Sequence, residues 1–256
     1  MLKIIYFTCI FLSTTVSFAQ KITSGLPNFT PQTWATDEII RLEIIEDNKD
    51  FIGYGSDISN ILLSTANQNV LGYIGNNYQR LKIKFTSVKW NPTNRNQFLV
   101  TGKSLVKNVK VPFTGIITIQ RYATVQVQGE DTYTEIIKAS YTFNEDKKQK
   151  YTGVFEGYLS TRFKIEGERV VNPIENSGAD GASNNQFCGT WTSYATKQPK
   201  PCSWGDYRIP LCGPLDQGAG FFIPAPKFVK NGWENYMLAN IKNNANALKI
   251  EKQVWW

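Results

Sequence analysis

The sequence predicts a mainly β protein, in which an antiparallel meander forms a barrel or a strongly curved sandwich and a short helical segment follows near the C-terminus. Short runs rich in β-branched and aromatic residues recur along the chain, and glycines, prolines or polar turns separate them. Apolar and polar residues alternate within residues 78–88 (YQRLKIKFTSV), which is typical of a strand with one buried face. The connections are too short for parallel crossovers, so neighbouring strands are expected to pair antiparallel.

The expected strands begin with residues 39–46 (IIRLEIIE), whose apolar pattern also fits a helix. Residues 90–97 are polar and are expected to turn. Residues 167–186 hold the longest loop signal, because their second half is almost free of apolar side chains. Further strands are expected at 70–74, 78–88, 98–101, 105–109, 113–126, 132–143 and 151–165.

The C-terminal region is expected to be irregular over 213–230 and then helical. Apolar and aromatic residues recur at helical spacing over 233–241, and Asn231 is placed to cap that helix. Residues 247–256 fit the spacing of a helix and also that of a strand. Their content of Ala, Leu, Lys, Glu and Gln favours the helix.

An aromatic residue, one further residue, a glycine and a β-branched residue recur at 113–116, 151–154 and 187–190. This spacing is compatible with a repeated hairpin unit. Glycines that bend strands and let aromatic rings pack against them would produce the same pattern, and this interpretation is favoured.

Residues 1–19 have the pattern of a secretory signal peptide. Lys3 precedes an apolar run, and small residues stand at Ser17 and Ala19. The run is shorter than the roughly 20 residues that a membrane-spanning helix needs. We therefore expect a secreted or periplasmic protein without a membrane span, with a single β-rich domain at 20–256.

The formal net charge of +7 comes from scattered Lys and Arg residues. The tightest basic group, at 147–150, follows an acidic pair and fits the solvated tip of a hairpin better than a phosphate-binding patch. No nucleic-acid partner is expected. The expected partner is an unidentified ligand or protein outside the cytoplasm.

Residues 184–210 (NNQFCGTWTSYATKQPKPCSWGDYRIP) mix aromatic, cysteine and charged residues most densely. They predict a hairpin in which the segment KQPKP, at 197–201, forms the turn between the two strands. With the turn centred near Lys200, Trp191 would face Ile209 on an apolar face.

The same register sets Cys188 opposite Cys212, within reach of a disulfide. A bridge closing a loop of this length would contribute about 3 kcal/mol in the chain-entropy model. Cys202 would then stay unpaired in the turn.

The hairpin also predicts a binding face of aromatic rings with polar groups beside them, a composition favoured at ligand and protein contact sites. The alternative is that Trp191 and Tyr207 belong to the core while Tyr194 and Trp204 are exposed. The candidate binding residues are Trp191, Tyr194, Trp204, Asp206, Tyr207 and Arg208.

The chain contains no histidine. This excludes Ser-His-acid and Cys-His catalysis and removes the usual ligand of zinc and copper sites. No metal site and no cofactor are expected. Carboxylate pairs remain available, since glycoside hydrolysis needs two acids at a suitable separation; solvated or ion-paired acids are the alternative interpretation. The candidate acids are Glu156, Glu166, Glu168 and Asp206.

Gly189-Thr190-Trp191 resembles the Gly-X-Trp signature of lipocalin-like barrels, in which a meander encloses an apolar ligand. That family places the signature on its first strand, whereas here it follows most of the expected strands. The signal peptide together with segments such as LGYIGNNYQRLKIKF and NNQFCGTWTSY also resembles a group of secreted bacterial β-rich proteins without a characterised function.

The favoured function is a non-catalytic binding or surface-interaction module that is exported from the cytoplasm. A histidine-free glycan hydrolase that uses carboxylates is the first alternative, and a lipocalin-like carrier of an apolar ligand is the second. A hydrolase should show two carboxylates in an open cleft, and a carrier should show an enclosed apolar cavity of a few hundred Å³.

Overall fold

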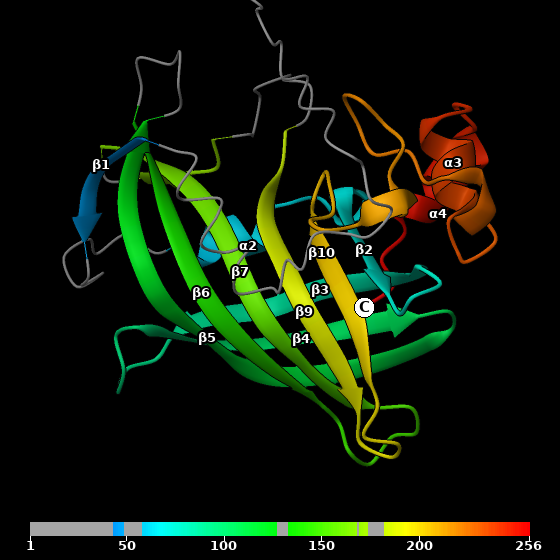
Figure 1. Ribbon diagram of the computed structural model, residues 1–256, viewed down its shortest axis with the longest axis horizontal. Helices are drawn as coiled ribbons and strands as arrows, with labels where there is room; N and C mark the ends of the chain where they lie inside the picture. Colours follow the sequence, from blue (N-terminus) through cyan, green and yellow to red (C-terminus); the bar gives the residue numbers. More distant parts are fainter. Residues whose placement is uncertain (1–42, 49–57, 127–132, 168, 174–181) are drawn as a thin grey trace, which may run out of the picture.

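The computed structural model shown in Figure 1 describes residues 43–48, 58–126, 133–167, 169–173 and 182–256. Eight antiparallel strands form a closed ring, so the prediction of a mainly β antiparallel meander is confirmed, and of its two alternatives the structure has the barrel. In chain order the ring consists of β2 (Val70–Ile74), β3 (Gln79–Trp90), β4 (Gln97–Val106), β5 (Val109–Gln126), β6 (Tyr133–Glu145), β7 (Gly153–Glu166), β9 (Asn184–Ser193) and β10 (Pro199–Asp206), and β10 pairs with β2 to close it.

Two short strands lie outside the ring. β1 (Glu43–Asn48) pairs with the far end of β5, and β8 (Arg169–Val171) pairs with the end of β7. β1 covers part of the strand expected at 39–46; residues 39–42 lie outside the described residues. The predicted signal peptide at 1–19 also lies outside them.

Aromatic side chains fill the interior of the ring. Phe187 from β9 stacks on Trp204 from β10, with ring centroids 4.7 Å apart. Further rings from the other side of the barrel complete the core, and this burial is the main stabilising contribution of the fold. The interior rings that are almost fully buried include Phe98, Tyr122, Phe143, Phe155, Phe163, Phe187 and Trp204.

Glycines let strands β7 and β9 approach each other closely. Gly157 faces Gly189 across this pair, and a Cβ atom on Gly189 would lie only 2.0 Å from the carbonyl oxygen of Glu156. Gly115 and Gly153, from the recurring aromatic-glycine pattern, meet neighbouring backbone in the same way. Close backbone approach therefore accounts for the glycines of that pattern.

The C-terminal unit packs on the outer face of β2 and β3 (Figure 1). It comprises the short 3₁₀ turns η2 (Gly213–Leu215) and η3 (Pro226–Phe228) and the helices α3 (Glu234–Asn240) and α4 (Ala245–Lys252). The helix expected at 233–241 is confirmed, and α4 shows that the helix was the right choice for most of 247–256. None of the helices in the described ranges is long and apolar enough to cross a membrane.

The helix caps differ from the prediction. Trp233, not Asn231, occupies the N-cap of α3, and the Asn231 side chain donates to the carbonyl oxygen of Asn77 instead. The side chain of Asn244 caps α4 by accepting from the Ala247 amide at 2.9 Å. Asn231 thus ties the C-terminal unit to the β2–β3 turn.

An ion pair buried between the barrel and α4 holds the C-terminal unit in place. The Arg80 guanidinium donates to both carboxylate oxygens of Glu251, at 2.7 and 2.5 Å. The same guanidinium lies over the rings of Trp233 and Tyr236, 5.1 and 5.6 Å from their centroids. The pair therefore joins β3, α3 and α4 at one point.

The predicted hairpin register is wrong. The chain turns at 194–196. The next residue, Lys197, adopts a φ of +57°, and its backbone amide donates to the carbonyl oxygen of Ser193. Pro199 and Pro201 begin β10 and do not break the hairpin, because proline is tolerated at the first residues of a strand. As a result Trp191 pairs with Lys200, not with Ile209.

The predicted Cys188–Cys212 disulfide is also wrong. Cys188 pairs with Ser203 and Cys202 pairs with Gly189, while Cys212 lies beyond the end of β10. None of the three cysteines in the described residues forms a disulfide, and Cys188 and Cys202 are buried. The shorter hairpin thus moves Cys188 and Cys212 apart, and Cys202 lies within a strand, not in the turn.

Candidate ligand-binding groove

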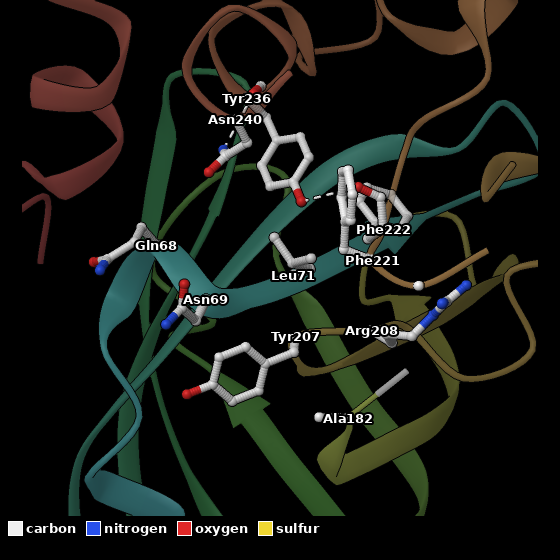
Figure 2. A pocket seen from close by; sticks show the side chains of 11 residues that line it. Gln68, Asn69, Leu71, Ala182, Tyr207, Arg208, Phe221, Phe222, Tyr236 and Asn240 are labelled. Atoms are coloured by element: carbon white, nitrogen blue, oxygen red, sulfur yellow. Dashed lines mark hydrogen bonds between the residues drawn. The ribbon is translucent and has the colours of Figure 1, made fainter. Parts of the chain in front are cut away.

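A groove of about 370 Å³ lies where the rim of the barrel meets the C-terminal unit. Figure 2 shows Tyr207 on one side of it and Tyr236 on the other, with Leu71 between them and the amides of Gln68 and Asn69 at one end. The walls come from η1 (Asn67–Asn69), the residues after β10, the segment before η3, and α3.

The floor of the groove is apolar and its outer edge carries an exposed ring. Leu71, Phe222 and Tyr236 are buried, and the Tyr236 hydroxyl donates to the carbonyl oxygen of Phe222 at 3.1 Å. Phe221 projects at the edge with 57 % of its surface exposed. The exposed phenyl ring offers apolar surface to a ligand in the adjoining hollow.

Backbone strain positions Tyr207. This residue has a φ of +64°, and the amide of Arg208 donates to the carbonyl oxygen of Asp206 at 2.7 Å. Together these features define a γ-turn whose central residue has positive φ, a rare and strained arrangement. A bulky residue with such a backbone requires support from its surroundings, and strain of this kind clusters at functional sites.

Three hydrogen bonds support the strained turn. The Tyr207 amide donates to the carbonyl oxygen of Asn69 at 2.7 Å. The Gln186 side chain donates to the carbonyl oxygens of Arg208 and Asn184, at 3.0 and 2.9 Å. Gly205 leaves room for Gln186, since a Cβ atom there would lie 2.1 Å from the Gln186 amide nitrogen.

The charge of Arg208 is neutralised beside the groove. Its guanidinium donates to Asp216 at 2.5 Å and to the carbonyl oxygens of Gly218 and Ala219 at 2.9 and 3.1 Å. Asp216 also accepts from the backbone amides of Gly218 and Ile223. Arg208 and Asp216 therefore shape the 216–223 loop, and their charges are satisfied by each other.

Polar groups at the other end of the groove are available to a ligand. In the part of the chain that the structure describes, the side chains of Gln68, Asn69 and Tyr207 make no hydrogen bond. Asn240, which is exposed, donates to the carbonyl oxygen of Tyr236 and keeps its side-chain oxygen open. The groove thus offers amide donors and acceptors beside aromatic rings.

The structure separates the six residues of the predicted binding face. Tyr207 and Arg208 line the groove. Trp204 belongs to the barrel core, and Asp206 is buried beside it. The other two, Trp191 and Tyr194, lie near Glu145: the Trp191 indole donates to its carboxylate, and the Tyr194 hydroxyl donates to its backbone carbonyl.

Asp206, the residue that precedes Tyr207, is buried. One of its carboxylate oxygens accepts from Thr65 and from Asn185, both at 2.6 Å. Burial raises the pKa of Asp206 to about 7, although these two hydrogen bonds and the charge of Lys84 act in the opposite direction. Because Thr65 precedes η1 and Tyr207 follows Asp206, this carboxyl group links two walls of the groove.

A second buried carboxyl group, Glu145, was not predicted. It accepts from the Ser104 hydroxyl at 2.5 Å, from the Gly153 amide at 2.9 Å and from the Trp191 indole at 2.9 Å. Burial raises its pKa, and the three donors lower it in part. With these partners fixed, Glu145 joins β4, β6, β7 and β9, so its role is structural.

The candidate acids that the structure describes do not form an open carboxylate cleft. Asp206 faces a cavity of only about 20 Å³, which is large enough for a water molecule but not for a sugar. Glu156 and Glu166 are exposed on β7, and Glu168 lies outside the described residues. Within the described ranges no three His, Cys, Asp or Glu side chains gather closely enough to hold a metal ion.

Sequence reasoning missed most of the groove. Gln68 and Asn69 precede β2 in a polar run, and Phe221 stands in a glycine-rich segment expected to be irregular. An aromatic pair such as Phe221-Phe222 in a glycine-rich loop could have indicated a contact site. No local pattern indicates that this pair, the residues before β2 and α3 meet at one point.

Comparison of the chain with protein-family models, with curated proteins and with solved structures found no match.

Proposed function

We propose that this chain is an exported, non-catalytic binding module and that the groove beside Tyr207 is its ligand site. The observation that carries the proposal is the strained γ-turn at Tyr207, which is held by Gln186 and Asn69. The surrounding residues hold Tyr207 in a strained backbone conformation, next to side-chain amides that have no partner. Such strain is typical of a site that contacts a ligand.

The packing of the barrel favours this function over carriage of an apolar ligand inside the ring. Phe143, Phe155, Phe187 and Trp204 are almost fully buried and occupy the interior. Small barrels of eight strands can be filled by their own side chains, and then the ring is a scaffold. The sites that such a scaffold presents lie at its rim and on its loops.

A fragment screen tests the proposal. Neutral fragments should shift backbone amide resonances of Gln68, Asn69, Tyr207 and Phe221 in isotope-labelled protein, and Phe221→Ala should abolish these shifts. Tyr133→Ala is a matched control, because Tyr133 has the same exposed fraction of 57 % but lies outside the groove. Fragments that bind without shifting the groove resonances, and whose binding is unaffected by Phe221→Ala, would contradict the assignment of the groove as the ligand site.

A further inference from the structure

The described lining of the groove contains one charged residue, Arg208, and its charge is already balanced. Its guanidinium is bound by Asp216 and by two carbonyl oxygens of the same loop. A ligand with a phosphate or carboxylate group would need a free cation, and one with an ammonium group would need a free carboxylate. The described lining offers neither, so the preferred ligand is uncharged.

The groove presents its polar and apolar groups on different sides. Phe221 and Tyr207 offer ring surface, with Leu71 and Phe222 below them. Gln68, Asn69 and Asn240 offer side-chain amides, each of which can donate and accept. The ligand that matches this pattern has a flat apolar face and neighbouring hydroxyl groups around its edge.

We infer that the groove binds a neutral saccharide, an inference that rests on the proposed function. A pyranose ring presents aliphatic C–H groups on a face and hydroxyl groups at its edge. The C–H face would stack on Phe221 or Tyr207, where apolar area is removed from water. The hydroxyl groups would bind the amides of Gln68 and Asn69.

The volume and openness of the groove set the length of the ligand. About 370 Å³ lies in the range of small-molecule sites. Phe221 and Asn240 are exposed at the edge, so a longer chain can leave the groove on that side. The site therefore suits one or two sugar rings of a saccharide that continues into solvent.

A proline-rich peptide is the competing neutral ligand, since such peptides bind aromatic grooves in an extended form. It requires a row of aromatic residues along several turns of the peptide. The groove exposes Phe221 and part of Tyr207, while Phe222 and Tyr236 are buried in its floor. The side-chain amides, which exceed the exposed rings in number, favour hydroxyl groups as partners.

Amide chemical-shift titration of the full chain distinguishes these ligands. The probes are the neutral disaccharides cellobiose, maltose, lactose and N,N′-diacetylchitobiose, a capped oligoproline peptide, and glucuronic acid as an anionic control. At least one disaccharide should shift the groove resonances with saturable binding. Phe221→Ala and Asn69→Ala should each weaken that affinity tenfold or more, while Tyr133→Ala leaves it unchanged.

Salt dependence gives an independent readout. Raising the ionic strength from about 20 to about 500 mM shortens the Debye length from roughly 20 Å to a few Å. Because the ligand is uncharged, this change should alter the affinity less than twofold. An affinity that falls steeply with salt would overturn the inference.

The remaining outcomes separate the inference from the proposed function. Binding of the oligoproline or of a neutral fragment in the groove, without binding of any disaccharide, overturns the saccharide and leaves the ligand site intact. Failure of every probe to shift the groove resonances overturns both.

Discussion

Tyr207 shows most directly how a single residue serves the groove at a cost to stability. Its positive φ is disfavoured for every residue with a Cβ atom and most strongly for β-branched residues. Glycine at this position would be free of that strain but would remove the ring from the groove. The residue is therefore expected to be selected for contact and not for folding.

Two substitutions at this position test the strain. Tyr207→Gly should leave the free energy of unfolding within about 1 kcal/mol of the wild type, because relief of strain offsets the lost packing and the added chain entropy. Tyr207→Val should be less stable than Tyr207→Gly by about 1 to 2 kcal/mol. Urea unfolding of both variants measures the difference, and equal stabilities would show that the turn is not strained.

Asp206 makes a pH-dependent contribution to stability. Its folded-state pKa of about 7 lies above the ordinary value of 3.8. Between these values the folded protein binds the proton more tightly than the unfolded chain does, so stability falls as the pH rises. The contribution is fully present below about pH 4 and is lost as the pH passes through 7.

Asp206→Asn removes this titration. The variant should gain stability relative to the wild type as the pH rises from 5 to 8, by an amount on the order of 2 to 4 kcal/mol. Urea unfolding at both pH values measures the change. Glu156→Gln, which removes an exposed carboxylate from β7, is the control and should show little change. If the free energies of unfolding of Asp206→Asn and the wild type differ by the same amount at both pH values, Asp206 does not have the raised pKa.

Among the elements, α4 is held by the buried carboxylate of Glu251, which pairs with Arg80 at 2.5 Å and with Lys82 at 3.7 Å. Burial alone would raise the pKa of Glu251, but the hydrogen bonds and charges of Arg80 and Lys82 outweigh it and lower that pKa. Glu251→Gln would leave the Arg80 guanidinium, whose side chain is only 7 % exposed, without its partner. Breaking such a pair costs about 3 to 5 kcal/mol.

Hydrogen exchange locates this effect. Glu251→Gln should accelerate amide exchange in α3 and α4 while the barrel strands stay protected, because α3 and α4 pack against each other. Replacing both partners, as Arg80→Met with Glu251→Leu, should restore part of the protection, since the buried guanidinium is removed together with the carboxylate and only Lys82, whose side chain is 21 % exposed, loses an ion-pair partner. Uniform acceleration across the barrel would show that the C-terminal unit is not a separate cooperative element.

The strands were predictable because each carries its own pattern, whereas the hairpin register was not. Alternation in β3 and short polar turns between strands are local signals. The β9–β10 register depends on Lys197 adopting positive φ and on Pro201, whose carbonyl oxygen accepts from Gly75 on the neighbouring β2 turn. That second partner is far away in the sequence, so residue patterns alone placed the turn several positions too late.

At the scale of the whole molecule, the antiparallel meander was predictable, whereas its closure into a ring and the groove were not. A meander of aromatic-rich strands can bury its rings in a barrel or in a curved sandwich, and local patterns do not distinguish the two. The groove instead arises from the docking of the C-terminal unit on the outside of β2 and β3, through contacts such as those of Arg80 with Glu251 and Trp233. No sequence-local pattern specifies that docking.

The fold also determines which thiols react. Burial raises the pKa of Cys202 far above its ordinary value, and burial raises that of Cys212 to about 11. In native protein a maleimide should label Cys212 slowly and leave Cys188 and Cys202 unmodified, because the latter two are buried. After unfolding in denaturant without reductant, all three should react; recovery of Cys188 and Cys212 in one disulfide-linked peptide would contradict the strand register.

The central claim is that ligand recognition takes place in the groove on the flank of a filled barrel. A crystal structure of the protein with the strongest binder from the fragment and saccharide titrations tests it most directly. The account predicts ligand density against the rings of Tyr207 and Phe221, within hydrogen-bonding distance of the Gln68 or Asn69 amide. Density inside the ring of strands beside Trp204 and Asp206, with the groove empty, would contradict it.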